Sequence, residues 1–442
     1  MGGRIKASAA QTKVAREKPL RLFFLCLSFA LILFAFSFNT PAQIWSGSLI
    51  ILSSPANLLT DYFQLANIGA ALVNVGLMTL LSFGLINMSG AALTGPVIAA
   101  VFTVAGFSLF GKNLYNSLPI ILGVWLYARA ARQPFKKFIA QGLFGTALSP
   151  LVSEFSFNAG LPPIPGVMLG IMAGTLAGFM LVPLSVQCLR FHEGFNLYNT
   201  GFTAGLIGMI FMAVLRGFGV EIGTVSILSS GHNPAFSAFL LGLSAALLLF
   251  GLAMNGWRLR GFRELLKLPG IMPTDFMAVS GMGPTLINMG LLCALATGYV
   301  LALGGELNGP VIGGIFTVVG FGACGKHIRN VVPVIAGVFI VSQFNIHDAS
   351  STFALMAALF GTTLAPIAGR YGPAAGILAG ALHVSLVSNI SFLHAGMNLY
   401  NNGFSGGFIA AALHPLFSSL LAVRQARKGE ALAQAPSGQG DN

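Results

Sequence analysis

The sequence predicts an all-α integral membrane protein made of two inverted-topology repeats with broken or re-entrant helices. The 442-residue chain is 55% hydrophobic and only 8% charged, and its mean hydropathy is +0.83. Apolar stretches long enough to cross a bilayer, or most of one, recur along it. Inside hydrocarbon every backbone polar group needs an internal partner, so we expect these stretches to be helices. The alternating pattern of a membrane β-barrel is absent from the sequence.

A duplication is the second observation behind this fold class. Residues 93–124 match residues 307–338 at 17 of 32 positions without a gap, at a constant offset of 214. A second block, HEGFNLYNTGF from His192, returns as HAGMNLYNNGF from His394 with 8 of 11 positions shared. The expected units are a basic tail (1–19), repeat 1 (20–216), a connecting loop (217–233), repeat 2 (234–424) and a second tail (425–442).

Four apolar stretches are the clearest candidates for spanning helices: residues 22–38, 67–86, 164–187 and 235–255. The first of them follows a basic segment, an arrangement that also fits a secretory signal. Because residues 235–255 occupy the same position in the second repeat, we expect residues 22–38 to be a retained helix.

Other segments are too short or too broken for simple spanning helices. Residues 95–110 and 309–324 open with Gly-Pro and end at Gly-Lys, while residues 117–128 and 331–341 begin beside a proline. Proline suits the first turn of a helix. Half-helices of this kind direct positive dipole ends into the bilayer, which is tolerated only around a cavity or protein interior. Close packing of helices by small residues is the alternative.

Basic residues indicate the orientation. Of the 23 Lys and Arg, 17 lie in four clusters: the N-terminal tail, residues 129–137, 258–267 and 424–428. Positively charged loops stay in the cytoplasm, so we expect both termini there. Residues 342–350, the equivalent of 129–137, contain no Lys or Arg. Equivalent loops are therefore expected on opposite sides, and inversion requires an odd number of crossings per repeat: about seven, or five plus a re-entrant pair. In total we expect about 10–14 membrane segments.

Two pairs of ionisable residues recur in the repeats. Lys112 and Lys326 follow glycine in apolar surroundings, where a lysine at the bilayer centre costs ~3 kcal/mol or more. They either snorkel to an interface or neutralise an anion or a carboxylate. Asp61 and Asp275 either cap the helix that follows or act as counter-ions or as sites for ion or proton coupling.

The NLYN motif is a more specific signal, because amide and phenol groups offer both donors and acceptors to a small solute. Helix capping and anchoring at an interface are the alternative. Histidines flank both copies of the motif, and we expect them to be structural or to modulate pH-dependent coupling rather than to bind a metal. These candidates are Asn196, Tyr198, Asn199 and His192 in the first repeat, and Asn398, Tyr400, Asn401 and His394 in the second.

Several other motifs are rejected. Both Gly-Lys segments fit G-x4-G-K, but Asn113 and His327 stand where a phosphate loop needs Ser or Thr. The net charge of +12 is explained by topology and predicts no nucleic-acid partner. The four cysteines occur singly, without a CxxC motif, and are expected to be packing residues. No metal or other cofactor is expected.

The repeated GPVI…FTV.GF…GK…N..P block, with the NLYN.GF block, is similar to an uncharacterised bacterial family of multi-spanning membrane proteins, a duplicated domain of unknown function. The resemblance covers most of the chain and implies the bacterial inner membrane, but it implies no activity and no site residues. More loosely, the architecture is similar to urea channels and to seven-plus-seven inverted-repeat transporters. This analogy does not identify a substrate.

We therefore expect a transporter or channel for a small polar or anionic solute, with its pathway at the interface of the two repeats. Lys112, Lys326 and the NLYN residues would bind the solute. A membrane-embedded enzyme, hinted at by Glu193 and the pair His347 and Asp348, is one alternative, and a non-transporting scaffold is another. The expected partners are the solute and the lipid bilayer, and the sequence leaves a homo-oligomer open.

Overall fold

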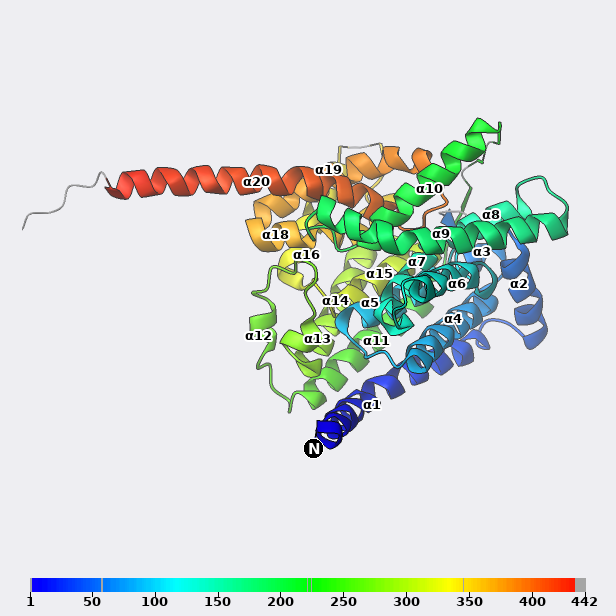
Figure 1. The fold of residues 1–442 in the computed structure, drawn as a ribbon, viewed down its shortest axis with the longest axis horizontal. Coiled ribbons are helices and arrows are strands. Elements are labelled where there is room, and N and C mark those ends of the chain that lie inside the picture. The colour runs from blue at the N-terminus through cyan, green and yellow to red at the C-terminus, as the bar shows by residue number, and fades with distance from the viewer. Residues whose placement is uncertain (1, 57–58, 221, 224, 345, 434–442) are drawn as a thin grey trace, which may run out of the picture.

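The computed structural model describes residues 2–433 except 57–58, 221, 224 and 345, and the described residues form a bundle of helices (Figure 1). Among them, nine helical stretches are long and apolar enough to cross a membrane, and three shorter apolar helices accompany these. The prediction of an all-α membrane fold is confirmed.

The described residues of the two halves contain the same succession of α-helices, although the short strands and 3-10 helices do not correspond one to one. The first half contains α1 (Gly2–Ala35), α2 (Pro41–Ser53), β1 (Leu59–Thr60), α3 (Tyr62–Leu65), α4 (Ile68–Ser89), α5 (Gly95–Phe107), α6 (Leu114–Ala130), η1 (Phe135–Lys137), α7 (Ile139–Gly145), η2 (Thr146–Leu148), α8 (Ser149–Phe157), α9 (Pro163–Phe191) and α10 (Asn199–Gly217). The remainder contains β2 (Ser226–Ile227), α11 (Asn233–Met254), α12 (Phe262–Leu265), α13 (Phe276–Val279), α14 (Met282–Ala302), α15 (Gly309–Phe321), α16 (Ile328–Ser342), α17 (Thr352–Gly361), η3 (Thr362–Leu364), α18 (Ala365–Tyr371), α19 (Pro373–Ile390), η4 (Ser391–His394) and α20 (Asn401–Ala433).

The short helices α5 and α15 pack against each other at the centre of the molecule (Figure 1). They run antiparallel, because Gly95 at the start of α5 lies beside Ala323, just after α15, and Gly309 at the start of α15 lies beside Leu109. Glycine allows this approach: a Cβ on Gly106 would lie 2.8 Å from the carbonyl oxygen of Gly313. Small residues thus bring the broken helices of the two halves into contact.

Longer helices surround this pair. Helix α1 packs against α4, and its equivalent α11 packs against α14. Phenylalanines also join α1 to α11, with Phe23 stacked on Phe250 at 6.2 Å and Phe34 on Phe239 at 5.7 Å between ring centroids. These contacts pair the earlier residue of α1 with the later residue of α11. The equivalent helices α1 and α11 are therefore also antiparallel.

The connecting segment between the halves is held against the first half. Strand β2 pairs in parallel with β1, and Ser229 donates two hydrogen bonds to Asp61, from its backbone nitrogen at 3.0 Å and its hydroxyl at 2.6 Å. This segment is therefore a strap fixed to the first half.

Helices α6 and α16 begin earlier than the sequence predicted. They start at Leu114 and Ile328, and Pro119 and Pro333 lie inside them. In the first half Asn113 and Asn116 form a reciprocal capping box, with bonds of 2.9 and 2.8 Å between each side chain and the other residue's backbone nitrogen. The amide cap sets the start of the helix, and proline is accommodated within its early turns.

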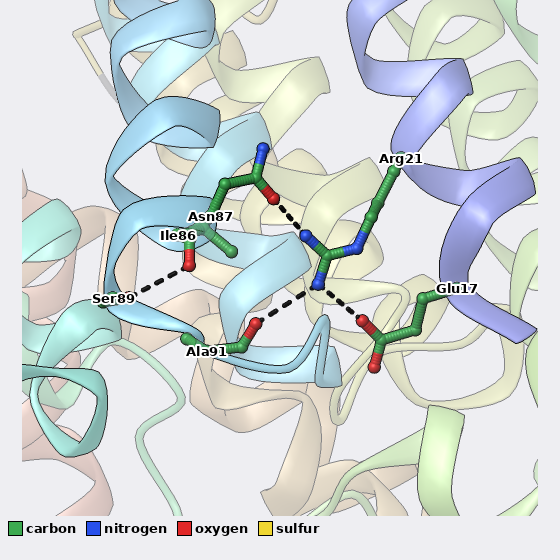
Figure 2. Close-up of polar contacts among 6 residues, drawn as sticks. All are labelled: Glu17, Arg21, Ile86, Asn87, Ser89 and Ala91. Carbon is green, nitrogen blue, oxygen red and sulfur yellow. Dashed lines mark hydrogen bonds and ion pairs between the residues drawn. The ribbon is translucent and has the colours of Figure 1, made fainter. Parts of the chain in front are cut away.

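Arg21 connects α1 to the end of α4, as Figure 2 shows. Its guanidinium forms an ion pair with Glu17 at 2.8 Å and donates to the side chain of Asn87 and, at 3.4 Å, to the carbonyl of Ala91. The middle of the first long helix is thus fixed to its neighbour in the bundle.

A labelling experiment tests the inverted arrangement expected from the loop charges. Gln133 and Gln343 are exposed residues in equivalent loops. In a cysteine-free background, single cysteines at these positions should react with a membrane-impermeant thiol reagent from opposite sides of the membrane. Labelling of both from the same side would contradict inversion.

A second experiment tests the central crossing. We expect Gly106→Val to destabilise the protein by about 1–3 kcal/mol, because the added side chain would overpack the contact with Gly313. The measurement is thermal unfolding in detergent. Gly298→Ala is the matched control, since a Cβ there meets nothing within 4 Å. An unchanged melting temperature for the Gly106 variant would show that the crossing can expand without cost.

Candidate functional site between the two halves

The two Gly-Lys turns are built in the same way. Each follows a half-helix and contains a glycine in the left-handed region, Gly111 at φ +80° and Gly325 at φ +100°. An asparagine from a neighbouring helix closes each turn. Asn74 of α4 donates to the carbonyls of Ser108 at 2.7 Å and Lys112 at 2.8 Å, and Asn288 of α14 makes the equivalent bonds around Lys326 at 2.8 and 2.7 Å. These caps satisfy carbonyls that a helix end leaves unpaired.

The lysine side chains point inward. Lys112 and Lys326 are both 0% exposed, so neither snorkels to an interface. Lys112 donates to the Tyr400 hydroxyl at 2.6 Å, and Lys326 donates to the Tyr198 hydroxyl at 2.5 Å and to the hydroxyl of Thr362 at 2.6 Å. Each lysine therefore reaches across to the tyrosine of the other half.

Aromatic rings supply a second contact for each ammonium. The nitrogen of Lys112 lies 4.6 Å from the ring centroid of Tyr400 and 5.2 Å from that of Phe107. Lys326 has the equivalent contacts with Tyr198 at 4.4 Å and Phe321 at 5.2 Å. Ring faces attract cations, but they carry no negative charge. None of the ion pairs formed by the described residues involves either lysine.

The two NLYN segments hold these tyrosines in place through hydrogen bonds that each segment makes to the other half. Asn196 donates to the carbonyl of Gly403 at 2.9 Å, and Asn398 donates to the carbonyl of Gly201 at 3.1 Å. Each of these asparagines also accepts from the backbone nitrogen of the tyrosine in its own motif, Tyr198 at 3.2 Å and Tyr400 at 2.9 Å. The first asparagine of each motif thus positions the phenol on which the lysine of the other half depends.

The histidines and the second asparagines form a separate local arrangement. His192 pairs with Asn199 at 3.0 Å and His394 with Asn401 at 2.9 Å. Each of these asparagines also donates to a carbonyl of the preceding long segment, that of Ser185 or Val387. This arrangement fixes the turn before α10 and α20.

A cavity of about 350 Å³ lies where the two halves meet. Its wall is mostly apolar, and the side chains that line it come largely in equivalent pairs. These pairs are Thr103 and Thr317, Phe107 and Phe321, Phe144 and Phe360, Leu197 and Leu399, and Tyr198 and Tyr400.

Another part of the wall is not paired. The cavity extends to Gln141 of α7 and to residues 272–274 before α13. The residues equivalent to Gln141 and Thr274 are Ala357 and Thr60, which are buried and do not belong to the described wall. The cavity therefore extends further toward one end of the molecule than toward the other.

The aspartates cap helices and do not face the lysines. Asp61 accepts from the backbone of Phe63 in its own half at 3.0 Å and from Gly309 at the start of α15 at 3.3 Å. Asp275 accepts from Ala278 at 3.2 Å and from Gly95 at the start of α5 at 3.0 Å. A carboxylate at a helix N-terminus also interacts favourably with the helix dipole. Each aspartate thus caps its own short helix and the half-helix of the other half.

A family comparison covers most of this structure. The family model described as "Protein of unknown function (DUF1576)" matches residues 40–217 and again residues 254–419. The chain belongs to the DUF1576 family. The double match is consistent with a duplicated domain of unknown function. No curated protein and no solved structure matches this chain.

The structure of this DUF1576 protein brings some of the residues predicted from the sequence together and leaves others apart. The lysines, the tyrosines and the first asparagines of the NLYN motifs meet, whereas the aspartates and the histidine pairs lie in capping arrangements. The paired threonines and phenylalanines of the cavity wall were missed. Thr103 and Phe107 recur at the offset of 214 as Thr317 and Phe321, so the duplication itself was the available signal.

Glu193, the basis of the enzyme alternative, belongs to another cluster. Its carboxylate lies 3.2 Å from His414, whose other ring nitrogen lies 2.5 Å from the hydroxyl of Tyr371. None of the three belongs to the described wall of the cavity. His347 packs against Phe353, and Asp348 accepts from Ser350.

The capping role of Asp61 can be tested in this DUF1576 protein. Asp61→Ala should lower the stability by about 3 kcal/mol or more, because several buried donors lose their acceptor at once and each costs about 1–3 kcal/mol. Thermal unfolding in detergent measures the loss. Asp348→Ala is the control. It removes an exposed carboxylate whose local hydrogen bonds water can replace, so this variant should unfold at the same temperature as the parent protein. Equal melting temperatures for all three proteins would contradict this assignment.

Proposed function

We propose that the protein is a membrane transporter for a small anionic or polar solute, with the solute site in the cavity between the two halves. The cavity carries this proposal. It lies within a bundle of membrane helices, at the contact of two broken helices, and equivalent residues of both halves line it. Transporters with internal repeats bind their solutes in this kind of place.

The antiparallel course of equivalent helices supports an inverted repeat. Helices α5 and α15 run in opposite directions, and so do α1 and α11. If these helices cross the membrane, the two halves have opposite orientations within it. Such halves can expose a central site to one side and then to the other by exchanging conformations.

The unequal extent of the cavity toward the two ends of the molecule favours an alternating-access mechanism rather than a continuously open channel. Gln141 follows the basic loop of residues 129–137, and residues 272–274 follow the basic loop of residues 258–267. Basic loops are cytoplasmic by the charge rule. The cavity therefore extends toward the side that we assign to the cytoplasm, in a bacterial inner membrane. On the other side, the equivalent residues are buried and do not line the cavity.

Uptake into proteoliposomes tests this function. The probes are radiolabelled urea, chloride, propionate and 3-phenylpropionate, each compared with uptake by protein-free liposomes. We expect at least one probe to enter faster with protein. Lys112→Gln and Lys326→Gln should each reduce that uptake at least tenfold, since each removes a buried cation from behind the wall of the cavity.

Lys267→Gln is the control, because this exposed lysine pairs only with Glu264 among the described residues. It should transport like the parent. The double mutant with both lysines replaced by glutamine is the decisive case. If it inserts, remains monodisperse and still transports normally, the buried lysines have no part in transport. Absence of protein-dependent uptake for every probe would contradict the proposed function.

A further inference from the structure

The two lysines are not equally satisfied. Lys326 donates to two hydroxyl groups, Tyr198 and Thr362. Lys112 donates to Tyr400 alone among the described residues. The residue equivalent to Thr362 is Thr146. Each threonine donates to the carbonyl three residues earlier, Leu359 at 2.5 Å and Leu143 at 2.6 Å, but among the described residues only Thr362 also accepts from the lysine of its half. A protonated lysine has three hydrogens to donate, so Lys112, when protonated, is the lysine with the larger unmet demand for acceptors and for a counter-charge.

The surroundings of Lys112 leave this demand open. The side chain is 0% exposed, and the rings of Phe107 and Tyr400 are its cation–π partners. A buried charge without a counter-ion is unfavourable by several kcal/mol. Because both aromatic partners line the cavity, a negative group inside the cavity can supply the missing charge.

Tyr400 is the link between the lysine and the cavity. Its oxygen accepts from Lys112, and among the described residues this hydroxyl donates no hydrogen bond, so a ligand in the cavity can accept from it. A phenol polarised by an ammonium is a strong donor to an anion, since hydrogen bonds with ionised partners are roughly twice as strong as neutral ones. The anion would thus be bound by the hydroxyl at the wall and by the positive charge behind it.

The rest of the wall determines what the anion must carry. Four phenylalanine rings, Phe107, Phe144, Phe321 and Phe360, face the cavity. A hydrophilic neutral solute, or a bare inorganic ion, would lose its hydration there without enough polar partners. A cation would meet the two lysines. A volume of about 350 Å³ lies at the lower end of the range for small-molecule sites.

We propose that the cavity binds an organic monoanion with an apolar, ring-sized body, its charged group at the Tyr400 hydroxyl in front of Lys112 and its body among the phenylalanine rings. This proposal rests on the proposed function, since it names the class of solute for the same cavity.

Calorimetry on the full chain in lipid nanodiscs tests the class of ligand. The probe is 3-phenylpropionate, and three relatives each change one property: propionate lacks the ring, 3-phenylpropanamide lacks the charge and 3-phenylpropylammonium reverses it. We expect 3-phenylpropionate to bind at least tenfold more tightly than any relative, after subtraction of the heat from empty nanodiscs. Equal or tighter binding of any relative would overturn the proposal.

Substitutions test where the charged group lies. Lys112→Gln should weaken binding of 3-phenylpropionate at least tenfold, and Lys267→Gln should leave it unchanged. Tyr400→Phe keeps the ring but removes the donor, which covers the case in which the lysine variant does not fold. Tyr400→Phe should weaken binding of 3-phenylpropionate about tenfold, and Tyr198→Phe should weaken it less. Equal losses for the two tyrosine variants would overturn the assignment to Lys112.

The binding and uptake experiments distinguish failure of the proposed ligand class from failure of the proposed transport function. If 3-phenylpropionate binds as expected but neither it nor any other probe enters proteoliposomes faster with protein, the class of ligand stands and the transport function falls. If chloride or urea is transported while 3-phenylpropionate does not bind, the function stands and the class of ligand falls.

Discussion

The exchange of polar partners between the two halves is the constraint on which this structure depends. The first backbone N–H groups of half-helices α5 and α15 have no acceptor within their own helix, and inside the bundle water cannot supply one. Asp275 accepts from the start of α5, and Asp61 accepts from the start of α15. The same exchange recurs at Asn196 with Gly403, and at the lysines with the tyrosines. Each half therefore completes the hydrogen bonds of the other.

This exchange also explains where the cavity lies. The tyrosines must face the interface, because the lysines that donate to them come from the opposite half. Their rings, with those of Phe107 and Phe321, then form the wall. The polar groups that hold the two broken helices together and the groups that line the cavity are thus neighbours.

The sequence predicted the parts of this arrangement that depend on local pattern. Hydropathy placed four of the nine long apolar helices among the described residues, Gly-Pro placed the starts of α5 and α15, and the duplication identified the recurring polar residues. It did not reveal the exchange itself, because pairs such as Lys112 and Tyr400 are 288 positions apart. Capping by Asp61 was one of the two predicted alternatives, but its bond to Gly309 depends on how the halves pack. Thr362 gave no signal, since its equivalent Thr146 aligns only after the offset changes to 216.

The strap between the halves has a consequence for synthesis of the chain. A ribosome makes Asp61 long before Gly309, so this carboxylate would emerge without its partner from the second half. Ser229 follows directly after the first half and donates two hydrogen bonds to Asp61. Asp275 has no such delay, because Gly95 has already been made when it emerges. Among the described residues, the earlier of the two equivalent aspartates has this additional partner from the strap, and the partner is synthesised before the second half of the chain.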